Sequence, residues 1–447
     1  MRLLLTHGYI LAEDPKEQRI MKPYAPLGIL SLSAHLRDRG FEIDIYDSTF
    51  GSRQELFGIL DAGPPAALGI YGNLMTRRNV LDIAAYARAA GWIVILGGPE
   101  PSNYAEEFLA AGADLIVAGE AELALERLLA TGFDAAHWPS IPGLIFSTGG
   151  SIVRTGPAQL ISNLDAQPWP DRERVDIPRY LKVWREHHGA GSVSLITARG
   201  CPYHCNWCSH SVYGKSHRRR SPHSVADEVA WILDNYQPEM LWFADDVFTI
   251  HPGWILEFAA QMQRRRLHVP FECITRADRL SPQMADTLAQ LGCFRIWIGS
   301  ESGSQRILDA MRRGVKVEQV RHAVALCKQR GIQTGMFLMW GYEGEDISDI
   351  EATVDHVKQC RPDVFFTTIA YPIKGTPYFE QVASKLVTVR PWQDSTDRDF
   401  LVRGRHSRRF YQHADELLKN EMAGQPDELI IQAARDGLRQ TFEEVEA

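Results

Sequence analysis

Short apolar runs alternate with longer amphipathic segments along most of this chain, and this alternation limits its possible folds more than any other feature. Helical segments such as "PLGILSLSAHLRDRG" and "NVLDIAAYARAAG" each end at a glycine. In residues 1 to about 135 the apolar runs between the helical segments are "RLLLTH", "FEIDIYD", "ALGIYG", "WIVILGG" and "ADLIVAG". Strands that alternate with helices predict an α/β fold in which helices cover both faces of a parallel sheet. We therefore expect a Rossmann-like doubly wound unit in residues 1–135.

The same alternation resumes at about residue 191. The predicted strands there are "SVSLITA", "MLWFADD", "FECITRA", "FRIWIGS", "TGMFLMW" and "DVFFTTIA". Six strand–helix units predict a partial barrel of the (β/α)6 type over residues 191–380, with its chemistry at the carboxyl ends of the strands. Residues 136–190 are rich in proline and polar side chains and indicate a linker with some short structure. Residues 381–447 are polar and predict a helical extension.

Composition excludes several classes of protein. The 447 residues carry a net charge of −8, which gives no global attraction to nucleic acid or to an anionic membrane. The first residues, "MRLLLTHGYILAEDPKEQ", turn polar at once and indicate a strand instead of a signal peptide. No apolar run reaches eighteen residues, so we expect no membrane span and a cytoplasmic, reducing location.

Four isolated cysteines among apolar neighbours are expected to be buried thiols: Cys273, Cys293, Cys327 and Cys360.

Three further cysteines lie close together in "ARGCPYHCNWCSH", with the spacing C-x3-C-x2-C. They are Cys201, Cys205 and Cys208, and they follow the first predicted barrel strand. A 4Fe–4S cube usually has four thiolate ligands, so three thiolates leave one iron open to a substrate or cofactor. Two alternatives remain at this point: a zinc site completed by His204 or His210, and three thiols of an apolar core.

The segment "CPYHCNWC" resembles the signature of the radical S-adenosylmethionine (radical SAM) enzymes. The resemblance implies that the three thiolates hold a 4Fe–4S cluster whose open iron binds S-adenosylmethionine. It also implies reductive cleavage to a 5′-deoxyadenosyl radical, so that the cofactor supplies the chemistry and the protein orients it. The resemblance places Trp207 near the adenine.

Segments at the later strand ends are similar to the rest of this family's S-adenosylmethionine site. Asp245 and Asp246 in "FADDVF" lie where the family binds the amino group. Asp-Asp replaces the usual Gly-Gly-Glu there, as in the branch with a cobalamin-type domain, and the alternative is a solvated acidic loop. Arg276 in "ITRADRL" is expected at the carboxylate or ribose, or else in a surface salt bridge. Glu301 in "IGSESGS" resembles a ribose-binding acid, and the alternative is an acid at a helix N-terminus.

Residues 1–135 resemble the cobalamin-binding domain that one branch of the family carries. The strand ends "GGPEPS" and "GEAE" contribute the expected cobalamin contacts Gly97, Gly98, Gly119 and Glu120, because glycine lets a ligand approach the backbone. Ordinary strand-to-helix turns are the alternative. The motif D-x-H-x-x-G, whose histidine binds cobalt in many such domains, is absent. The domain therefore binds cobalamin without a protein imidazole, or it binds nothing.

This resemblance implies methyl transfer to an unactivated carbon or phosphorus centre. The alternative is oxidative cyclisation or rearrangement, as in the anaerobic porphyrin-ester cyclases. The expected partners are a small-molecule substrate and an electron donor such as flavodoxin or ferredoxin, without nucleic acid. Two rivals are a zinc or nucleic-acid binding protein that uses the basic stretches 214–220 and 403–409, and a protein whose cluster serves electron transfer alone.

Overall fold

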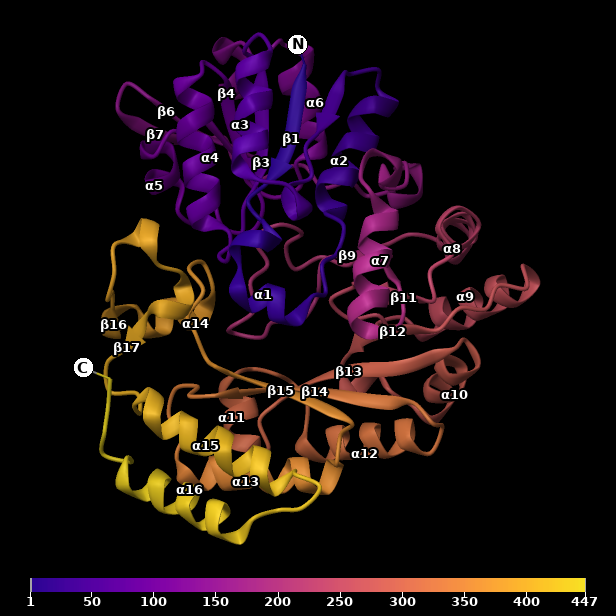
Figure 1. Ribbon diagram of the computed structural model, residues 1–447, viewed down its shortest axis with the longest axis vertical. Helices are drawn as coiled ribbons and strands as arrows, with labels where there is room; N and C mark the ends of the chain where they lie inside the picture. Colours follow the sequence, from indigo (N-terminus) through magenta and orange to yellow (C-terminus); the bar gives the residue numbers. More distant parts are fainter. Residues whose placement is uncertain (1, 447) are drawn as a thin grey trace. The chain divides into compact units, whose positions relative to one another are not determined.

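The computed structural model describes residues 2–446 and divides into two compact units. The first unit comprises Met1–Pro202, Ser209–Met240 and Trp392–Thr396. The second comprises Tyr203–Cys208, Leu241–Pro391 and Asp397–Ala447. Figure 1 shows the course of the chain through both units. No helix among the described residues is long and apolar enough to cross a membrane.

The first unit is built on a seven-stranded sheet with the order β2-β1-β3-β4-β5-β6-β7. Its first five strands are parallel, as the sequence predicted. They are β1 (Leu3–His7), β2 (Ile43–Ile45), β3 (Ala67–Tyr71), β4 (Ile93–Gly97) and β5 (Leu115–Val117). The helices between them are α1 (Pro15–Ile20), α2 (Leu27–Asp38), α3 (Arg53–Ala62), α4 (Arg77–Ala89), α5 (Ala105–Ala110) and α6 (Glu122–Ala130).

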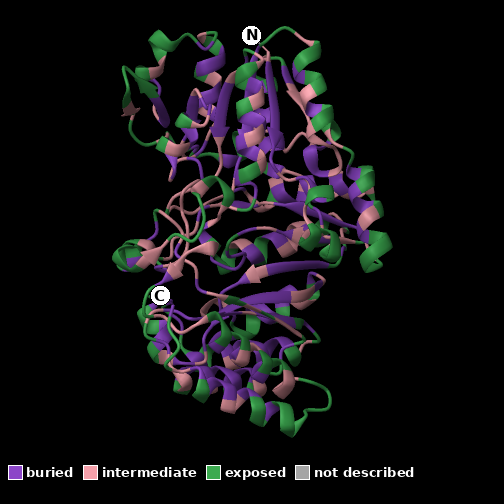
Figure 2. Cartoon of the chain, turned by 60° about the vertical axis from the view of Figure 1, so that its left-hand side comes forward, coloured by how far each residue is buried: buried purple, intermediate pink, exposed green. Residues whose placement is uncertain are grey.

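Both faces of this sheet are buried, which explains why its strands are continuous apolar runs in the sequence. Along β1, Leu4 belongs to the core that includes residues of α3, α4 and α5. Its neighbours Leu3 and Leu5 belong to the opposite core, which includes residues of α2 and α6. Figure 2 shows most of the parallel strands as buried and the helices as partly exposed. The doubly wound prediction is therefore confirmed.

Two antiparallel strands, β6 (Leu144–Thr148) and β7 (Ser151–Arg154), extend the sheet beyond β5. They lie in residues 136–190, where the sequence predicted a linker with some short structure but did not place these two strands. Their turn, Gly149–Gly150, has φ values of 56° and 78°, which suit the tight turns that join antiparallel strands. The helix α7 (Ile177–His188) occupies the same stretch, and the side chain of Asp176 caps it by accepting from Arg179 N at 3.0 Å.

The first unit also contains a buried ion-pair cluster. Arg172 donates to Glu228 at 2.5 Å, and Arg220 pairs with the second oxygen of the same carboxylate. Burial raises the pKa of Glu228, but the two guanidinium groups outweigh burial and hold the pKa below its usual value. The elements here are β8 (Ser192–Leu195), β9 (Ala198–Arg199), β10 (Arg218–Arg219) and α8 (Pro222–Tyr236).

The second unit has a parallel row of strands in the order β15-β14-β13-β12-β11. The strands are β11 (Met240–Phe243), β12 (Phe271–Thr275), β13 (Cys293–Glu301), β14 (Gln333–Trp340) and β15 (Val364–Ile369). The helices are α9 (Pro252–Arg264), α10 (Pro282–Gln290), α11 (Gln305–Ala310), α12 (Val317–Lys328) and α13 (Ile347–Cys360). Together with β8, these five strands account for the six strand segments predicted over residues 191–380.

Two longer helices follow near the C-terminus, α15 (Arg408–Glu421) and α16 (Glu428–Gln440), and they pack against each other. Before them lie the short helix α14 (Pro377–Val382) and an antiparallel pair, β16 (Leu386–Val387) and β17 (Leu401–Val402). The sequence predicted the helical character of this part and missed the strand pair, whose strands have only two residues each.

Candidate functional site

The cysteine loop begins directly after β9. Asn206, between two of the cysteines, forms hydrogen bonds within the second unit: its N–H donates to Met311 O at 3.0 Å and its Nδ2 to Ala310 O at 3.2 Å. Within the motif, Cys208 N donates to Cys205 O at 3.3 Å. The backbone of this part of the loop is therefore fixed by hydrogen bonds.

None of the seven cysteines is in a disulfide. Cys205 is buried, whereas Cys201 and Cys208 are partly exposed. Among residues 2–446, no group of three His, Cys, Asp or Glu side chains has the arrangement of a metal site. The assignment of these three thiols as cluster ligands therefore stays a prediction. The four isolated cysteines are buried, as predicted.

Arg313 contacts the buried cysteine of the motif. Its Nη1 lies 3.7 Å from the sulfur of Cys205, and its Nη2 donates to Gly299 O at 2.9 Å. Its Nε lies 3.7 Å from Glu301 Oε1, so one guanidinium group faces both a thiol and a carboxylate. A buried cation at this position would stabilise a negatively charged group bound beside the motif. The sequence analysis did not select Arg313, because only the fold brings this residue to the cysteine motif.

Glu301 ends β13 in an unusual conformation. Its φ is +63°, in the left-handed region that non-glycine residues seldom adopt, and the pairing with β14 shifts register here. Burial raises the pKa of Glu301 to about 7, although Arg313 and Arg276 lower it. A buried, strained acid beside the motif fits a ligand-binding role better than a helix-terminal acid.

The guanidinium group of Arg276 stacks on the ring of Tyr203 in the cysteine loop. Its guanidinium carbon is 3.7 Å from the ring centroid of Tyr203, and its Nε donates to Asp278 at 2.9 Å. Its Nη2 donates to Gly314 O at 3.2 Å, whereas the buried Nη1 has no hydrogen-bond partner. The surface salt bridge that was the alternative is excluded, because Arg276 is only 2 % exposed. The unsatisfied N–H group can donate to an anionic or hydroxyl ligand.

The two aspartates after β11 have different surroundings. Asp245 is buried, whereas Asp246 is exposed. Although part of its surface reaches solvent, neighbouring protein atoms partly desolvate the Asp246 carboxylate, and this desolvation, followed by the Asp245 carboxylate, raises the pKa of Asp246. Trp207 packs against an apolar cluster that includes Met311 and Tyr342, and its buried Nε1 has no hydrogen-bond partner. The structure does not test whether these three residues contact S-adenosylmethionine.

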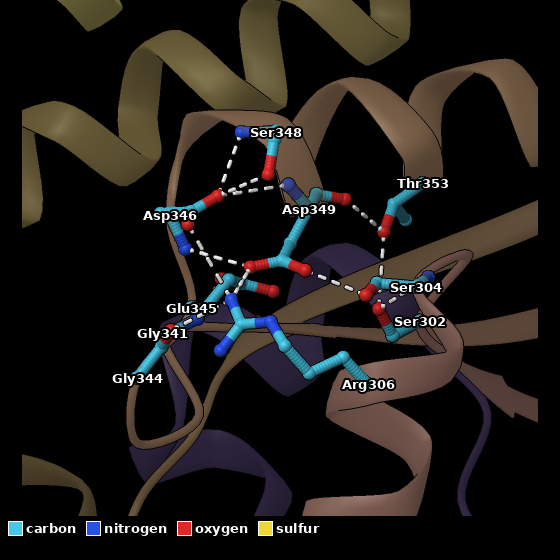
Figure 3. A network of polar contacts seen from close by, with 10 residues as sticks. All are labelled: Ser302, Ser304, Arg306, Gly341, Gly344, Glu345, Asp346, Ser348, Asp349 and Thr353. Carbon is cyan, nitrogen blue, oxygen red and sulfur yellow. Dashed lines mark hydrogen bonds and ion pairs between the residues drawn. The ribbon is translucent and has the colours of Figure 1, made fainter.

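A polar network follows Glu301 along the chain (Figure 3). Ser304 Oγ donates to Asp349 Oδ1 at 2.5 Å, and Arg306 pairs with the other oxygen of that carboxylate. Gly341 N donates to Glu345 Oε2 at 2.5 Å. Burial raises the pKa of Glu345 to about 8, against the effect of the Gly341 hydrogen bond. This network fixes the loop after β14, the "MWGYEGED" segment.

A second candidate site lies in the first unit, at the carboxyl ends of β1, β3, β4 and β5. The pocket together with its open mouth comprises about 730 Å3 of space that no protein atom fills. Gly97, Gly98, Gly119 and Glu120 all line it. The structure therefore brings together the four residues that were predicted as cobalamin contacts.

Glycine is required at one of these positions. Gly98 has a φ of +103°, and a Cβ there would lie 2.3 Å from Gly72 O.

The carboxylate of Glu120 is fixed by contacts within the protein: it pairs with Arg218 and Arg199 and accepts from Ile161 N at 3.1 Å. Glu120 thus shapes the pocket wall. Two tyrosines that the sequence analysis did not select, Tyr71 and Tyr213, also line the pocket.

No histidine lines this pocket among the described residues. His7, near the end of β1, is only 4 % exposed, and its Nε2 contacts Asp47 Oδ1 at 3.0 Å. The wide, glycine-lined and mainly apolar pocket fits a large planar cofactor approached by backbone. The residues that line the pocket are compatible with a cofactor bound without a protein imidazole ligand.

Two family models match the segments that contain the two candidate sites. The family model "Radical SAM superfamily" matches residues 195–357, and the model "B12 binding domain" matches residues 20–129. The chain is a radical SAM protein with an N-terminal B12-binding domain. These domains imply a 4Fe–4S cluster, S-adenosylmethionine and cobalamin as its cofactors. The two matched ranges lie within the predicted segments 191–380 and 1–135.

Relatives of this radical SAM protein include methyltransferases and cyclases. It is 26% identical over 393 residues to "Uncharacterized methyltransferase PH0819" of Pyrococcus horikoshii, covering 85% of this chain and 83% of the relative. It is 26% identical over 398 residues to an anaerobic magnesium-protoporphyrin IX monomethyl ester cyclase of Synechocystis, covering 85% and 77%. It is 23% identical over 368 residues to bacteriochlorophyllide d C-12(1)-methyltransferase of Chlorobaculum tepidum, covering 81% and 74%.

Solved structures share its fold. The radical SAM methyltransferase TsrM from Kitasatospora setae, with cobalamin and a [4Fe-4S] cluster bound, has a TM-score of 0.70 at 21% identity and covers 86% of this chain and 74% of that one. The cobalamin-dependent radical enzyme OxsB has a TM-score of 0.76 at 18% identity and covers 94% and 66%. At these identities the similarity shows the fold alone.

Proposed function

We propose that this protein is a cobalamin-dependent radical SAM methyltransferase that methylates an unactivated carbon or phosphorus centre of a small molecule. The observation that carries the proposal is the presence in one chain of two features. One is a three-cysteine loop inside a radical SAM match, and the other is a glycine-lined pocket inside a B12-binding match. With its cofactors bound, such an enzyme obtains a 5′-deoxyadenosyl radical from S-adenosylmethionine and a transferable methyl group on cobalamin.

The residue assignments follow from the chemistry of the side chains. Cys201, Cys205 and Cys208 are proposed to ligate the cluster. For S-adenosylmethionine, we assign the cationic amino group to Asp245 or Asp246 and the carboxylate and ribose to Arg276 and Glu301. Trp207 is assigned to the adenine. Gly97, Gly98, Gly119 and Glu120 are assigned to the cobalamin pocket.

The surroundings of these residues support the assignment. The unsatisfied N–H of Arg276 is a ready donor for a carboxylate or hydroxyl group. The raised pKa of Glu301 lets this acid hold a proton near neutral pH and donate or accept a hydrogen bond with little change in its surroundings. Arg313 places a buried cation beside Cys205, where the bound cluster would carry negative charge.

We also propose a role for each segment of the chain. Residues 1–135 bind cobalamin, 136–190 link the domains, 191–380 form the radical SAM core and 381–447 add a helical extension. An electron donor such as flavodoxin or ferredoxin is proposed to reduce the cluster. A 4Fe–4S cluster with an open iron persists best in a reducing compartment, which supports the cytoplasm as the location.

A second candidate function is oxidative cyclisation or rearrangement. Its support is the 26% identity to an anaerobic magnesium-protoporphyrin IX monomethyl ester cyclase over most of both chains. The two functions differ in how they use S-adenosylmethionine. Methyl transfer converts one molecule to S-adenosylhomocysteine and cleaves another to 5′-deoxyadenosine, whereas cyclisation yields no S-adenosylhomocysteine.

The test is product analysis by mass spectrometry. The anaerobically purified protein, loaded with iron, sulfide and cobalamin, is incubated with S-adenosylmethionine and a chemical reductant. Methyl transfer predicts both 5′-deoxyadenosine and S-adenosylhomocysteine. The Cys205→Ala variant should form no 5′-deoxyadenosine. The Cys360→Ala variant, in which a buried thiol outside the motif is replaced, is the control and should still form it. 5′-Deoxyadenosine alone favours the cyclase, and the absence of both products contradicts the proposal.

A further inference from the structure

Glu301 lies at the centre of a tight turn at the end of β13. Ser302 N donates to Ser300 O at 2.8 Å, so the turn closes over three residues. With a φ of +63° at Glu301, this is the form of γ-turn that is rare and strained. Such a conformation persists only where the surrounding structure holds it in place.

Three polar residues on one face of α13 contact this turn and the residues beside it. Asp349, Thr353 and His356 follow one another at intervals of four and three positions, so they lie along the same face of the helix. All three are buried. We call these three side chains the polar stripe. Figure 3 shows Asp349 and Thr353 facing Ser302 and Ser304.

Thr353 holds the residues that follow Glu301. Gly303 N donates to Thr353 Oγ1 at 2.9 Å, and the hydroxyl oxygens of Thr353 and Ser302 lie 3.2 Å apart. Thr353 Oγ1 itself donates to Asp349 O at 2.8 Å. The single proton of this hydroxyl group is therefore used within the helix, and Thr353 accepts from both Ser302 and Gly303.

His356 holds the residue that precedes Glu301. Its Nδ1 accepts from Arg321 Nε at 3.3 Å, and its Nε2 lies 3.0 Å from Ser300 Oγ. Burial, followed by Arg321, lowers the pKa of His356 to about 4, so the ring is neutral near pH 7 and carries one proton. Because an arginine can only donate, that proton is on Nε2 and is donated to Ser300.

The backbone of the turn also lies directly against α13. A Cβ built on Gly303 would lie 2.4 Å from Ala352 O and 2.6 Å from His356 Cβ, so any side chain at position 303 would move the turn away from the helix. The turn is therefore fixed to α13 through the residues on both sides of Glu301. The Glu301 carboxylate is left to face Arg313, whose Nε lies 3.7 Å from Glu301 Oε1.

We propose that Thr353 and His356 are positioning residues for S-adenosylmethionine, because they hold Glu301 in the strained turn from which it contacts this ligand. This role rests on the proposed function, in which Glu301 binds the carboxylate or ribose of S-adenosylmethionine. Both side chains are 0 % exposed, so they act through the turn and not by contact with the ligand. A turn that is held before the ligand arrives does not have to be ordered during binding, which increases affinity.

Binding of S-adenosylmethionine to the holoenzyme, measured by equilibrium dialysis without reductant, tests this role. Thr353→Val keeps the shape of the side chain but leaves Gly303 N without its acceptor. We expect a dissociation constant that is roughly tenfold higher. The rate of 5′-deoxyadenosine formation at saturating S-adenosylmethionine should stay within roughly twofold, because only binding is affected. Thr353→Ser restores the acceptor and should bind like the unchanged protein.

A matched control and a second variant accompany this measurement. Thr287→Val makes the same change at a buried threonine of α10, whose hydroxyl group donates to Gln283 O, and should leave the affinity unchanged. His356→Phe removes the hydrogen bond to Ser300 on the other side of the turn. It should raise the dissociation constant in the same direction as Thr353→Val.

A double-mutant cycle shows whether the effect passes through Glu301. Glu301→Ala removes the carboxylate and should weaken binding by itself. Adding Thr353→Val to Glu301→Ala should weaken binding no further, because the turn then presents no carboxylate to position. Effects that multiply as if the two residues were independent overturn the proposal. If Thr353→Val does not fold, the same cycle with His356→Phe decides.

The two proposals fail in different ways. An unchanged dissociation constant in Thr353→Val, or a lower rate at saturation with unchanged affinity, overturns the role of the polar stripe alone. Binding that depends on Thr353, without any 5′-deoxyadenosine from the unchanged protein and a chemical reductant, contradicts the proposed function and keeps this role. Failure of the unchanged protein to bind S-adenosylmethionine contradicts both.

Discussion

The guanidinium group of Arg313 lies 3.7 Å from the sulfur of Cys205, and both groups are buried. Cys205 is the middle cysteine of the motif and Arg313 lies 108 positions later in the chain. The same guanidinium faces Glu301 at 3.7 Å. A single cation therefore faces a proposed cluster ligand and a proposed S-adenosylmethionine ligand.

Loss of this cation should disable the site. Arg313→Met removes the positive charge beside Cys205 and leaves Glu301 buried without its partner, a change of the kind that costs about 3–5 kcal/mol. We expect less iron per chain after gel filtration and at least roughly tenfold slower 5′-deoxyadenosine formation. Arg312→Met changes the exposed neighbour and serves as the control. Normal iron content and rate in Arg313→Met would refute the role of this cation.

The buried acid Glu345 should make stability depend on pH. Its pKa in the folded protein is about 8, above its ordinary value of 4.5, because burial disfavours the charged form. Between these values the folded state binds more protons than the unfolded state, so stability falls as pH rises. The loss reaches an upper limit of about 5 kcal/mol above pH 8.

Thermal unfolding of the apoprotein at pH 5.5 and at pH 8.5 measures this effect. The Glu345→Gln variant cannot ionise at this position. Its unfolding midpoint should therefore fall less between pH 5.5 and pH 8.5 than that of the unchanged protein. Glu343→Gln, at a more exposed position in the same loop, is the control and should follow the unchanged protein. Parallel pH profiles for Glu345→Gln and the unchanged protein would show that Glu345 is charged throughout.

Arg77 should hold the segment Trp392–Thr396 in the first unit. Its side chain pairs with the buried Glu100, donates to Trp392 O at 3.1 Å and Ser395 O at 2.7 Å, and lies 4.9 Å from the ring centroid of Trp392. Arg77→Met breaks all of these contacts. We expect amide hydrogen exchange in residues 392–396 to become at least roughly tenfold faster.

The neighbouring arginine provides the matched control for this prediction. Arg78 also pairs with this segment, through Asp394, but the pair is exposed to solvent. An exposed ion pair contributes about 0–1 kcal/mol, so Arg78→Met should change exchange little. Equal exchange rates in the Arg77→Met and Arg78→Met variants would show that the buried contacts do not hold the segment.

The cobalamin pocket should lose its ligand when Gly97 gains a side chain. No atom lies within 4 Å of a Cβ built on Gly97, so Gly97→Val fills the pocket without displacing the protein. We expect at least roughly tenfold less cobalamin per chain, with an apoprotein midpoint within about 2 °C of the unchanged protein. Gly58→Ala, at an open position on α3, is the control. Full cobalamin retention by Gly97→Val would place the cofactor elsewhere.

The strand–helix alternation predicted the fold because parallel strands that are buried on both faces remain apolar along their whole length. The β6–β7 hairpin was missed, although Gly149–Gly150 between two short runs is a turn signal. Its outer strand is only partly buried and carries the polar residues Ser151 and Arg154, so it lacks the apolar run that marked the other strands.

The site was predictable where local segments determine it. The three cysteines, Arg276 and the pocket glycines all lie at strand ends, and their places follow from the order of the strands. Arg313 was not predictable, because strand register and tertiary packing bring distant residues together. Phe337 and Phe366, for example, become direct neighbours only through the pairing of β14 with β15.

The most direct test of the central claim is the content of iron and cobalt per chain. The protein is purified anaerobically from cells supplied with cobalamin and examined by elemental analysis. The account predicts about four irons and one cobalt in each chain. Iron without cobalt would contradict the cobalamin-dependent reaction and keep the radical chemistry, whereas the absence of iron would contradict both.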